Sequence, residues 1–154
     1  MRVCGIDPGN KGAMCVLDST DLTYIALLDL DKSSIYTAAK WLHNQQVDVI
    51  YLEDVHSLYG MSAKSNFNFG KNLGVVSAIA EIIKEGSTPK LVTPKVWQKF
   101  IGVNTKGKQI KHQVAAIALS LYPTANLRGK RGGLLDGRSD SLMIAHYGLQ
   151  KETT

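Results

Sequence analysis

The segment from Arg2 to Asp18 reads Arg-Val-Cys-Gly-Ile-Asp-Pro-Gly-Asn-Lys-Gly-Ala-Met-Cys-Val-Leu-Asp. Two short apolar runs, 3–7 and 13–18, flank the turn-forming residues Pro-Gly-Asn-Lys-Gly, a pattern typical of two strands joined in a hairpin. The first run delivers Asp7 directly into the glycine-rich turn. This aspartate has two interpretations at this point: it organises the turn by accepting backbone hydrogen bonds, or it is a functional carboxylate.

Downstream of the hairpin, the apolar residues alternate between strand and helix spacing. A third strand is expected near 24–28, then a helix capped by Ser33 or Ser34 and running through residue 42, and a buried strand over 47–52 that ends at Glu53. Helical spacing follows over 68–84, 94–100, 109–121 and 136–149, with a short strand over 90–93 and a Gly- and Arg-rich loop over 126–133. This order predicts one α/β domain over residues 1–154, with a mixed sheet flanked by helices.

The composition is that of a folded globular chain, because 44% of the 154 residues are hydrophobic and only 20% are charged. No run approaches the roughly 18 apolar residues of a membrane helix, and Asp7 comes too early for a signal peptide. We therefore expect a cytoplasmic protein without membrane contact. Cys4 and Cys15 lack the spacing of a metal-binding pair and are expected to be reduced and buried.

The whole chain carries a formal net charge of +5, and its basic residues are concentrated in its second half. Nine of the 18 Lys and Arg residues lie in one stretch of 44 residues: Lys95, Lys99, Lys106, Lys108, Lys111, Arg128, Lys130, Arg131 and Arg138. Such a concentration favours a polyanionic partner, whose phosphates these side chains would contact. Within it, the loop over 128–133 is either a DNA contact or a solvated loop that aids solubility.

Acidic residues end two of the predicted strands and begin the last helix. Glu53 ends the strand over 47–52, as Asp7 ends the first strand, so neighbouring strands would bring both carboxylates within reach of one cation. Asp136 and Asp140 are four residues apart and share one helix face, where like charges disfavour each other. Asp136 is also suited to the start of a helix, which leaves a simple capping role open for it.

Together, Asp7, Glu53, Asp136 and Asp140 supply the hard oxygen ligands that Mg²⁺ prefers. Four carboxylates suit two Mg²⁺ ions per active site, and Mn²⁺ is expected to substitute. The chemistry that this constellation predicts is metal-assisted phosphodiester hydrolysis.

The motifs also resemble those of the RuvC family of Holliday junction resolvases, in the same order from Arg2 to about Gly148. The segment from Gly5 to Gly9 resembles the family's opening strand and turn, Leu52-Glu53 its second acidic strand end, and the segment from Asp136 to Ala145 its terminal acidic helix. Residues 69–74 are similar to the start of its long dimer helix, and residues 93–97 and 111–114 to its basic region. One departure is the four-residue spacing of Asp136 and Asp140, where bacterial members usually have three.

The resemblance implies a ribonuclease-H-like fold and a Mg²⁺-dependent, structure-specific DNA endonuclease that resolves Holliday junctions by paired phosphodiester hydrolysis. It implies that the four acids bind the metal ions and that Lys111 approaches the scissile phosphate. It further implies a homodimer that binds branched DNA and needs no nucleotide cofactor, most similar to compact phage-type members. The DNA-binding residues expected on this basis are His56, Tyr59, Lys64, Phe69, Lys106, Lys108, Lys111, Arg128, Lys130 and Arg131.

Other functions share parts of this pattern. An actin-like or sugar-kinase ATPase also begins with a phosphate loop similar to Asp7-Pro8-Gly9, but such proteins need two domains of this kind and 154 residues supply one. A ribonuclease H acting on RNA–DNA hybrids would use the same acidic centre. A non-catalytic binding protein for branched DNA would keep the basic surface without needing the four acids. The sequence leaves open which backbone geometry the basic surface accepts.

Overall fold

The computed structural model describes residues 1–21, 23–55, 62–84 and 88–154. In these residues, five strands form one mixed sheet in the order β3-β2-β1-β4-β5. The strands β1 (Arg2–Asp7), β2 (Ala13–Asp18) and β3 (Ile25–Asp29) pair antiparallel, as the predicted hairpin requires. The strands β4 (Val49–Glu53) and β5 (Lys90–Val92) run parallel to β1. The predicted mixed sheet is therefore confirmed.

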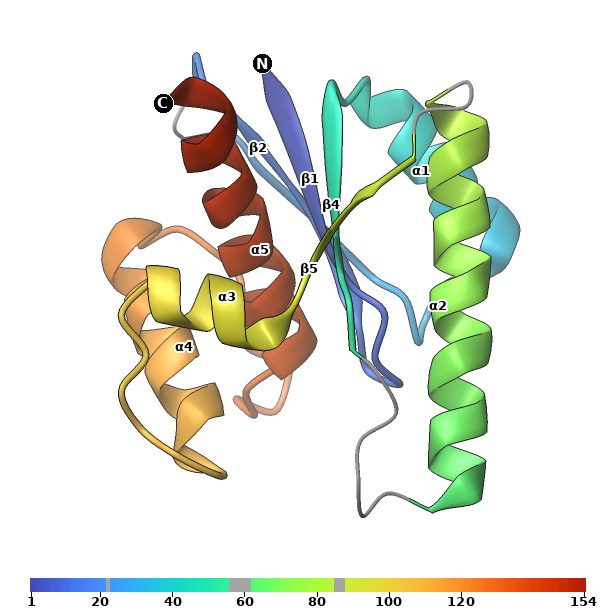
Figure 1. Ribbon diagram of the computed structural model, residues 1–154. Coiled ribbons are helices and arrows are strands. Elements are labelled where there is room, and N and C mark those ends of the chain that lie inside the picture. The colour runs from blue at the N-terminus through green and yellow to red at the C-terminus, as the bar shows by residue number, and fades with distance from the viewer. Residues whose placement is uncertain (22, 56–61, 85–87) are drawn as a thin grey trace.

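Helices cover both faces of this sheet (Figure 1). Helices α1 (Ile35–Gln45) and α2 (Ala63–Ile83) lie on one face, and helices α3 (Pro94–Phe100), α4 (Gln109–Leu121) and α5 (Asp136–Thr153) lie on the other. The predicted α/β class is confirmed. In the described part of the chain, no helix is both long enough and apolar enough to cross a membrane.

Helix ends differ from the prediction where capping, and not apolar spacing, sets the boundary. Helix α2 begins at Ala63, five residues before the predicted start, because the Ser62 hydroxyl accepts the first-turn N–H of Ser65 at 3.2 Å. Ser34, and not Ser33, caps α1. Thr93 precedes α3 but makes no side-chain capping bond. The first turn of α2 contains mainly polar residues, so apolar spacing could not indicate where the helix begins.

Alternation along β1 divides the core into two parts. Val3 packs with the α5 residues, whereas Cys4 and Ile6 pack with α1 and α2 on the other face. The same alternation directs Gly5 and Asp7 toward α5. Both cysteines are free and buried, as expected. A functional carboxylate at the end of β1 is thus directed to the face that α5 covers.

Gly5 is required by the close packing of α5 on β1. A Cβ atom at this position would lie 2.2 Å from the backbone nitrogen of Ala145 and 2.3 Å from the carbonyl oxygen of Ser141. Both of these atoms belong to the backbone of α5, which a small side-chain movement cannot displace. Any residue larger than glycine at this position must therefore push the helix away from the sheet.

We expect Gly5→Ala to destabilise the protein by about 1–3 kcal/mol or more, because the added methyl group overpacks the contact between β1 and α5. Urea denaturation would measure this change. Gly74→Ala is the matched control, because Gly74 lies on α2 with nothing within 4 Å of its added Cβ, and we expect it to stabilise the helix by about 0.5–1 kcal/mol. An unchanged urea midpoint for Gly5→Ala would contradict the proposed steric constraint.

Candidate active site

Asp7 and Glu53 end neighbouring parallel strands at the same edge of the sheet. The register pairs Ile6 of β1 with Leu52 of β4, so the next residue on each strand is one of the two acids. The N–H of Gly9 donates to Asp7 Oδ1 at 2.8 Å, which means that Asp7 also organises the turn. The turn-organising interpretation of Asp7 is therefore confirmed, and the same carboxylate lies at the strand end beside Glu53.

Helix α5 brings Asp136 and Asp140 to these strand ends. Its first turn packs on the turn between β1 and β2, where a Cβ on Gly137 would lie 2.0 Å from the carbonyl oxygen of Lys11. The Asp136 carboxylate, a quarter exposed, accepts an ion-paired hydrogen bond from the Lys111 ammonium of α4. The structure thus gathers all five residues that the sequence predicts as catalytic.

Burial of these acids disfavours their charged forms. Desolvation raises the pKa of Asp7 to about 6, and the negative charge of Asp136 adds to this shift. Desolvation, followed by repulsion from Asp7, raises the pKa of Glu53 to about 7. The pKa of Asp140 lies well above its usual range because of burial first and then repulsion from Asp7, Glu53 and Asp136. The four carboxylates therefore form one interacting electrostatic cluster.

The donor set of this cluster fits a hard divalent cation. All four side chains offer carboxylate oxygens, and a cation among them would offset both the desolvation and the mutual repulsion. In residues 1–21, 23–55, 62–84 and 88–154, however, no three or more Asp, Glu, His or Cys side chains are arranged in a group that could hold a metal ion. Asp136 is instead engaged by Lys111. A cation at Asp136 would have to compete with the ammonium of this lysine.

Trp97 is a site residue that sequence analysis did not identify as functional. Its indole Nε1–H donates to Glu53 Oε1 at 2.9 Å, and both side chains are buried. In the sequence, Trp97 is simply one apolar residue in the segment that follows β5. Nothing in its immediate neighbours indicates a carboxylate partner 44 positions earlier.

Arg138 does not belong to the phosphate-binding surface that its sequence neighbourhood suggests. Its guanidinium donates to both carboxylate oxygens of Asp29, at 2.6 and 2.9 Å, and to the carbonyl oxygen of Asn126 at 2.8 Å. The hydrogen bond from Arg138 is the largest contribution that lowers the pKa of Asp29 to about 2. This arginine joins the start of α5 to the end of β3.

The described basic residues predicted to contact DNA are all exposed. Lys106 and Lys108 precede α4, Arg128, Lys130 and Arg131 precede α5, and Lys64 lies in the first turn of α2. Figure 1 shows the beginnings of these three helices at the end of the molecule where β1 and β4 terminate. The basic segments therefore surround the edge of the sheet that carries the acids.

Three of the residues expected to bind DNA, His56, Tyr59 and Phe69, have aromatic rings that could stack on bases. His56 and Tyr59 lie outside the described residues. Phe69 is half-buried on α2, whereas Phe67, two residues earlier, is 72% exposed. Of the two phenylalanines, Phe67 is the one available for stacking on a base.

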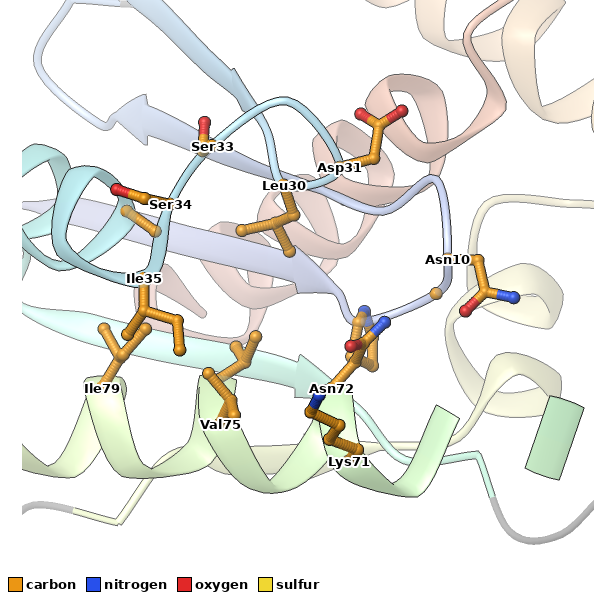
Figure 2. A pocket seen from close by; sticks show the side chains of 14 residues that line it. Asn10, Leu30, Asp31, Ser33, Ser34, Ile35, Lys71, Asn72, Val75 and Ile79 are labelled. Atoms are coloured by element: carbon orange, nitrogen blue, oxygen red, sulfur yellow. The ribbon is translucent and has the colours of Figure 1, made fainter. Parts of the chain in front are cut away.

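A cavity of about 400 Å³ lies beside the same turn but on the other face of the sheet. Its lining includes the apolar side chains of Leu30, Ile35 and Val75 and the polar residues Asn10 and Asn72, which come from α1, α2 and the neighbouring loops (Figure 2). None of the four site carboxylates lines this cavity. The acidic cluster is therefore a separate feature at the strand ends.

Comparison with known proteins places the fold. No family model matches the sequence, and no curated protein is similar to it in sequence at a significant level. Among solved structures, the Thermus thermophilus RuvC structure in complex with Holliday junction substrate has a TM-score of 0.63 and 15% identity, over 99% of this chain and 96% of that chain. A Thermus thermophilus RuvC structure has a TM-score of 0.61 and 19% identity, over 98% and 97%.

A Fowlpox virus resolvase in complex with substrate Holliday junction DNA has a TM-score of 0.58 and 19% identity, over the full length of both chains. The sheet order and the placement of the helices, together with these matches, define a ribonuclease-H-like α/β fold. Within that class, the chain has a RuvC-like fold over nearly its whole length.

We expect Glu53→Gln to stabilise the protein without metal at pH 8, and to have less effect at pH 5. The pKa of Glu53 is raised from 4.5 to about 7 in the folded state. Between these values the folded chain retains a proton that the unfolded chain has lost, so stability falls as pH rises. Glutamine does not ionise in this pH range, so the variant does not lose stability in this way as the pH rises. Thermal unfolding in EDTA at both pH values measures the effect.

The exposed Glu81 of α2 provides the control, because Glu81→Gln removes the same charge away from the cluster. It should shift the unfolding temperature equally at the two pH values. A Glu53→Gln variant that behaves like this control would contradict the electrostatic description of the site.

Proposed function

We propose that this protein is a divalent-metal-dependent endonuclease that resolves Holliday junctions, and related branched DNA, by paired phosphodiester hydrolysis. The observation that carries the proposal is the gathering of Asp7, Glu53, Asp136 and Asp140 at one edge of the sheet, with Lys111 beside them. The RuvC-like fold supports it, since the T. thermophilus and Fowlpox virus proteins of similar fold were solved with Holliday junction DNA.

In this proposal the four carboxylates hold two Mg²⁺ ions, for which Mn²⁺ would substitute. When bound, such ions supply a hydroxide nucleophile at neutral pH and stabilise the departing 3′ oxygen. Burial disfavours the charged forms of Asp7 and Glu53, and a bound cation would restore those charges and be held by them. The Lys111 ammonium lies beside Asp136 and is 61% exposed, so it can also reach a phosphate oxygen and neutralise charge there.

The DNA backbone would contact the exposed basic residues around this edge. Arg128, Lys130 and Arg131 extend from the segment before α5, Lys106 and Lys108 from the segment before α4, and Lys64 from the first turn of α2. Phosphate contacts of this kind position the duplex arms without reading their sequence. Stacking at the junction centre would fall to Phe67 or Phe69, or to His56 or Tyr59 in the adjacent segment.

We further propose that the protein acts as a homodimer. Helix α2 is 21 residues long and presents apolar side chains to solvent at both ends, with Phe67 72% and Ile82 74% exposed. A two-fold dimer would present two acidic sites in symmetric orientation, which suits paired nicks in a four-way junction. Sedimentation of the purified protein would give its oligomeric state directly.

We expect Asp140→Asn to bind a four-way junction normally and to abolish its cleavage, because the substitution removes a metal ligand and also reduces repulsion of phosphate. Labelled four-way junction, Y-fork, linear duplex and RNA–DNA hybrid would be incubated with Mg²⁺ or EDTA, and the products separated on gels. Glu81→Gln should cut like the unsubstituted protein, since Glu81 is an exposed residue of α2.

Paired, Mg²⁺-dependent nicks in the junction that disappear in Asp140→Asn would support a resolvase, and cutting of the Y-fork would set its breadth. Cleavage of the hybrid alone would instead mean a ribonuclease H. Binding of the junction without any cutting would mean a non-catalytic protein for branched DNA.

We expect a triple variant, with Arg128, Lys130 and Arg131 all replaced by alanine, to bind the junction more weakly and with a smaller salt dependence. Each lost phosphate contact reduces the slope of log K against log salt by about 0.9, so three lost contacts would reduce it by about 2.7. The slope is measured by fluorescence anisotropy in EDTA at several salt concentrations.

The control removes the same net charge at Lys40 of α1, Lys84 after α2 and Lys151 near the end of α5. Its slope should remain that of the unsubstituted protein. Equal slopes for the two triple variants would mean that the loop before α5 is not a specific DNA contact.

A further inference from the structure

Glu53 is the most enclosed of the four site acids, because only 8% of its surface is exposed at the end of β4 and the other three are half-buried. The Trp97 indole donates to Glu53 Oε1 at 2.9 Å and is itself completely buried. An indole has a single N–H and no acceptor, so this is the one hydrogen bond that its ring can make. The only polar group of the ring is thus bonded to one carboxylate oxygen of a candidate metal ligand.

The backbone holds Trp97 firmly in this position. The strand β5 pairs with β4 so that Val92 lies opposite Glu53, and Pro94 then begins α3 at once. The backbone N–H of Trp97 donates to the backbone carbonyl oxygen of Thr93 at 3.3 Å. The ring packs in the same core cluster as Val92 and residues of α4 and α5. Neither the ring nor its N–H can therefore turn away from the carboxylate without repacking this core.

This hydrogen bond restricts the rotation of the Glu53 carboxyl group. A glutamate side chain at a strand end has three rotatable bonds, and a terminal carboxyl group rotates freely unless a partner fixes it. With Oε1 held by Trp97, the remaining oxygen is presented in one defined orientation. Asp7 ends the neighbouring strand β1 in register with Glu53, so a second carboxylate of the cluster lies on the adjacent strand end.

We propose that Trp97 is a positioning residue, whose indole N–H holds Glu53 in the orientation in which it binds a divalent cation. The inference rests on the proposed function, because it takes Glu53 as a metal ligand. Partners that orient a ligand in this way typically change metal affinity by roughly 10–100-fold when they are lost. Trp97 should also report on metal binding, because a charge arriving at its hydrogen-bonded partner changes the electrostatic environment of the ring.

Fluorescence of the ring tests the contact without altering it. Trp41, which packs on the other core cluster from α1, is the other tryptophan of the chain, so Trp41→Phe leaves Trp97 as the single tryptophan, and its emission can be excited selectively. Titration of this variant with MgCl₂, in the absence of DNA, should produce a saturable change in Trp97 emission. The same titration with Glu53→Gln added should show no such change. An emission that Mg²⁺ never alters would overturn the inference.

Substitution of the ring tests the positioning role itself. Trp97→Phe keeps an aromatic ring in the core but removes the N–H donor. We expect the Mg²⁺ concentration that half-saturates thermal stabilisation to rise roughly 10–100-fold, with junction binding in EDTA unchanged. Tyr122→Phe is the control, because it removes another buried donor group, bonded to His146 at 2.9 Å, and should leave the Mg²⁺ midpoint unaltered.

A double-mutant cycle with Glu53→Gln separates positioning from general damage to the fold. If Trp97 acts through Glu53, Trp97→Phe should cause no further loss of Mg²⁺ affinity in the Glu53→Gln protein. An equal loss in both backgrounds would mean that Trp97 only fills the core and would overturn the inference. If Glu53→Gln alone leaves Mg²⁺ affinity unchanged, Glu53 is not a metal ligand, and that part of the proposed function fails together with this inference.

Discussion

Helix α5 lies directly on β1 because Gly5 presents no side chain to it. A Cβ at Gly5 would meet the backbone of α5 at 2.2 Å, and a Cβ at Gly148, near the other end of the helix, would meet the Tyr51 ring at 2.5 Å. These two contacts fix both the distance and the slope of the helix across the sheet. Asp140 lies one residue before Ser141, whose carbonyl oxygen faces Gly5. The glycine contact therefore determines how near the helix carboxylates come to the strand carboxylates.

Packing this close gathers negative charge in a poorly solvated place, which the folded protein must compensate. The first turn of α5 has no side-chain cap, and it is held instead by the ion pair from Arg138 to Asp29 on β3. Lys111 neutralises part of the charge on Asp136. Asp7 and Glu53 receive hydrogen bonds from Gly9 and Trp97, yet their pKa values remain raised. The cluster is thus held together by the surrounding structure against its own repulsion, the condition in which a divalent cation adds most stability.

Features that depend on residues near one another in sequence could be predicted from the sequence. The hairpin, the strand ends at Asp7 and Glu53, and the shared helix face of Asp136 and Asp140 follow from alternation and turn chemistry. The partners of Glu53 and Asp29 could not be predicted, because Trp97 and Arg138 lie 44 and 109 positions away from them. Local patterns contain no information about such contacts. Arg138 was grouped with the phosphate-binding residues for this reason.

The arrangement separates the groups that would perform chemistry from those that would select the substrate. The acids come from β1, β4 and α5, elements fixed by the core, and their positions depend on backbone contacts such as that of Gly5. The exposed basic residues come from the first turn of α2 and from the segments that precede α4 and α5. These segments can change in length without disturbing the sheet. The full-length match to structures only 15–19% identical to this chain fits this separation, since the layered core is what such matches share. Under the proposed function, differences in the branched DNA accepted would then arise in these segments, while the metal site stays set by the core.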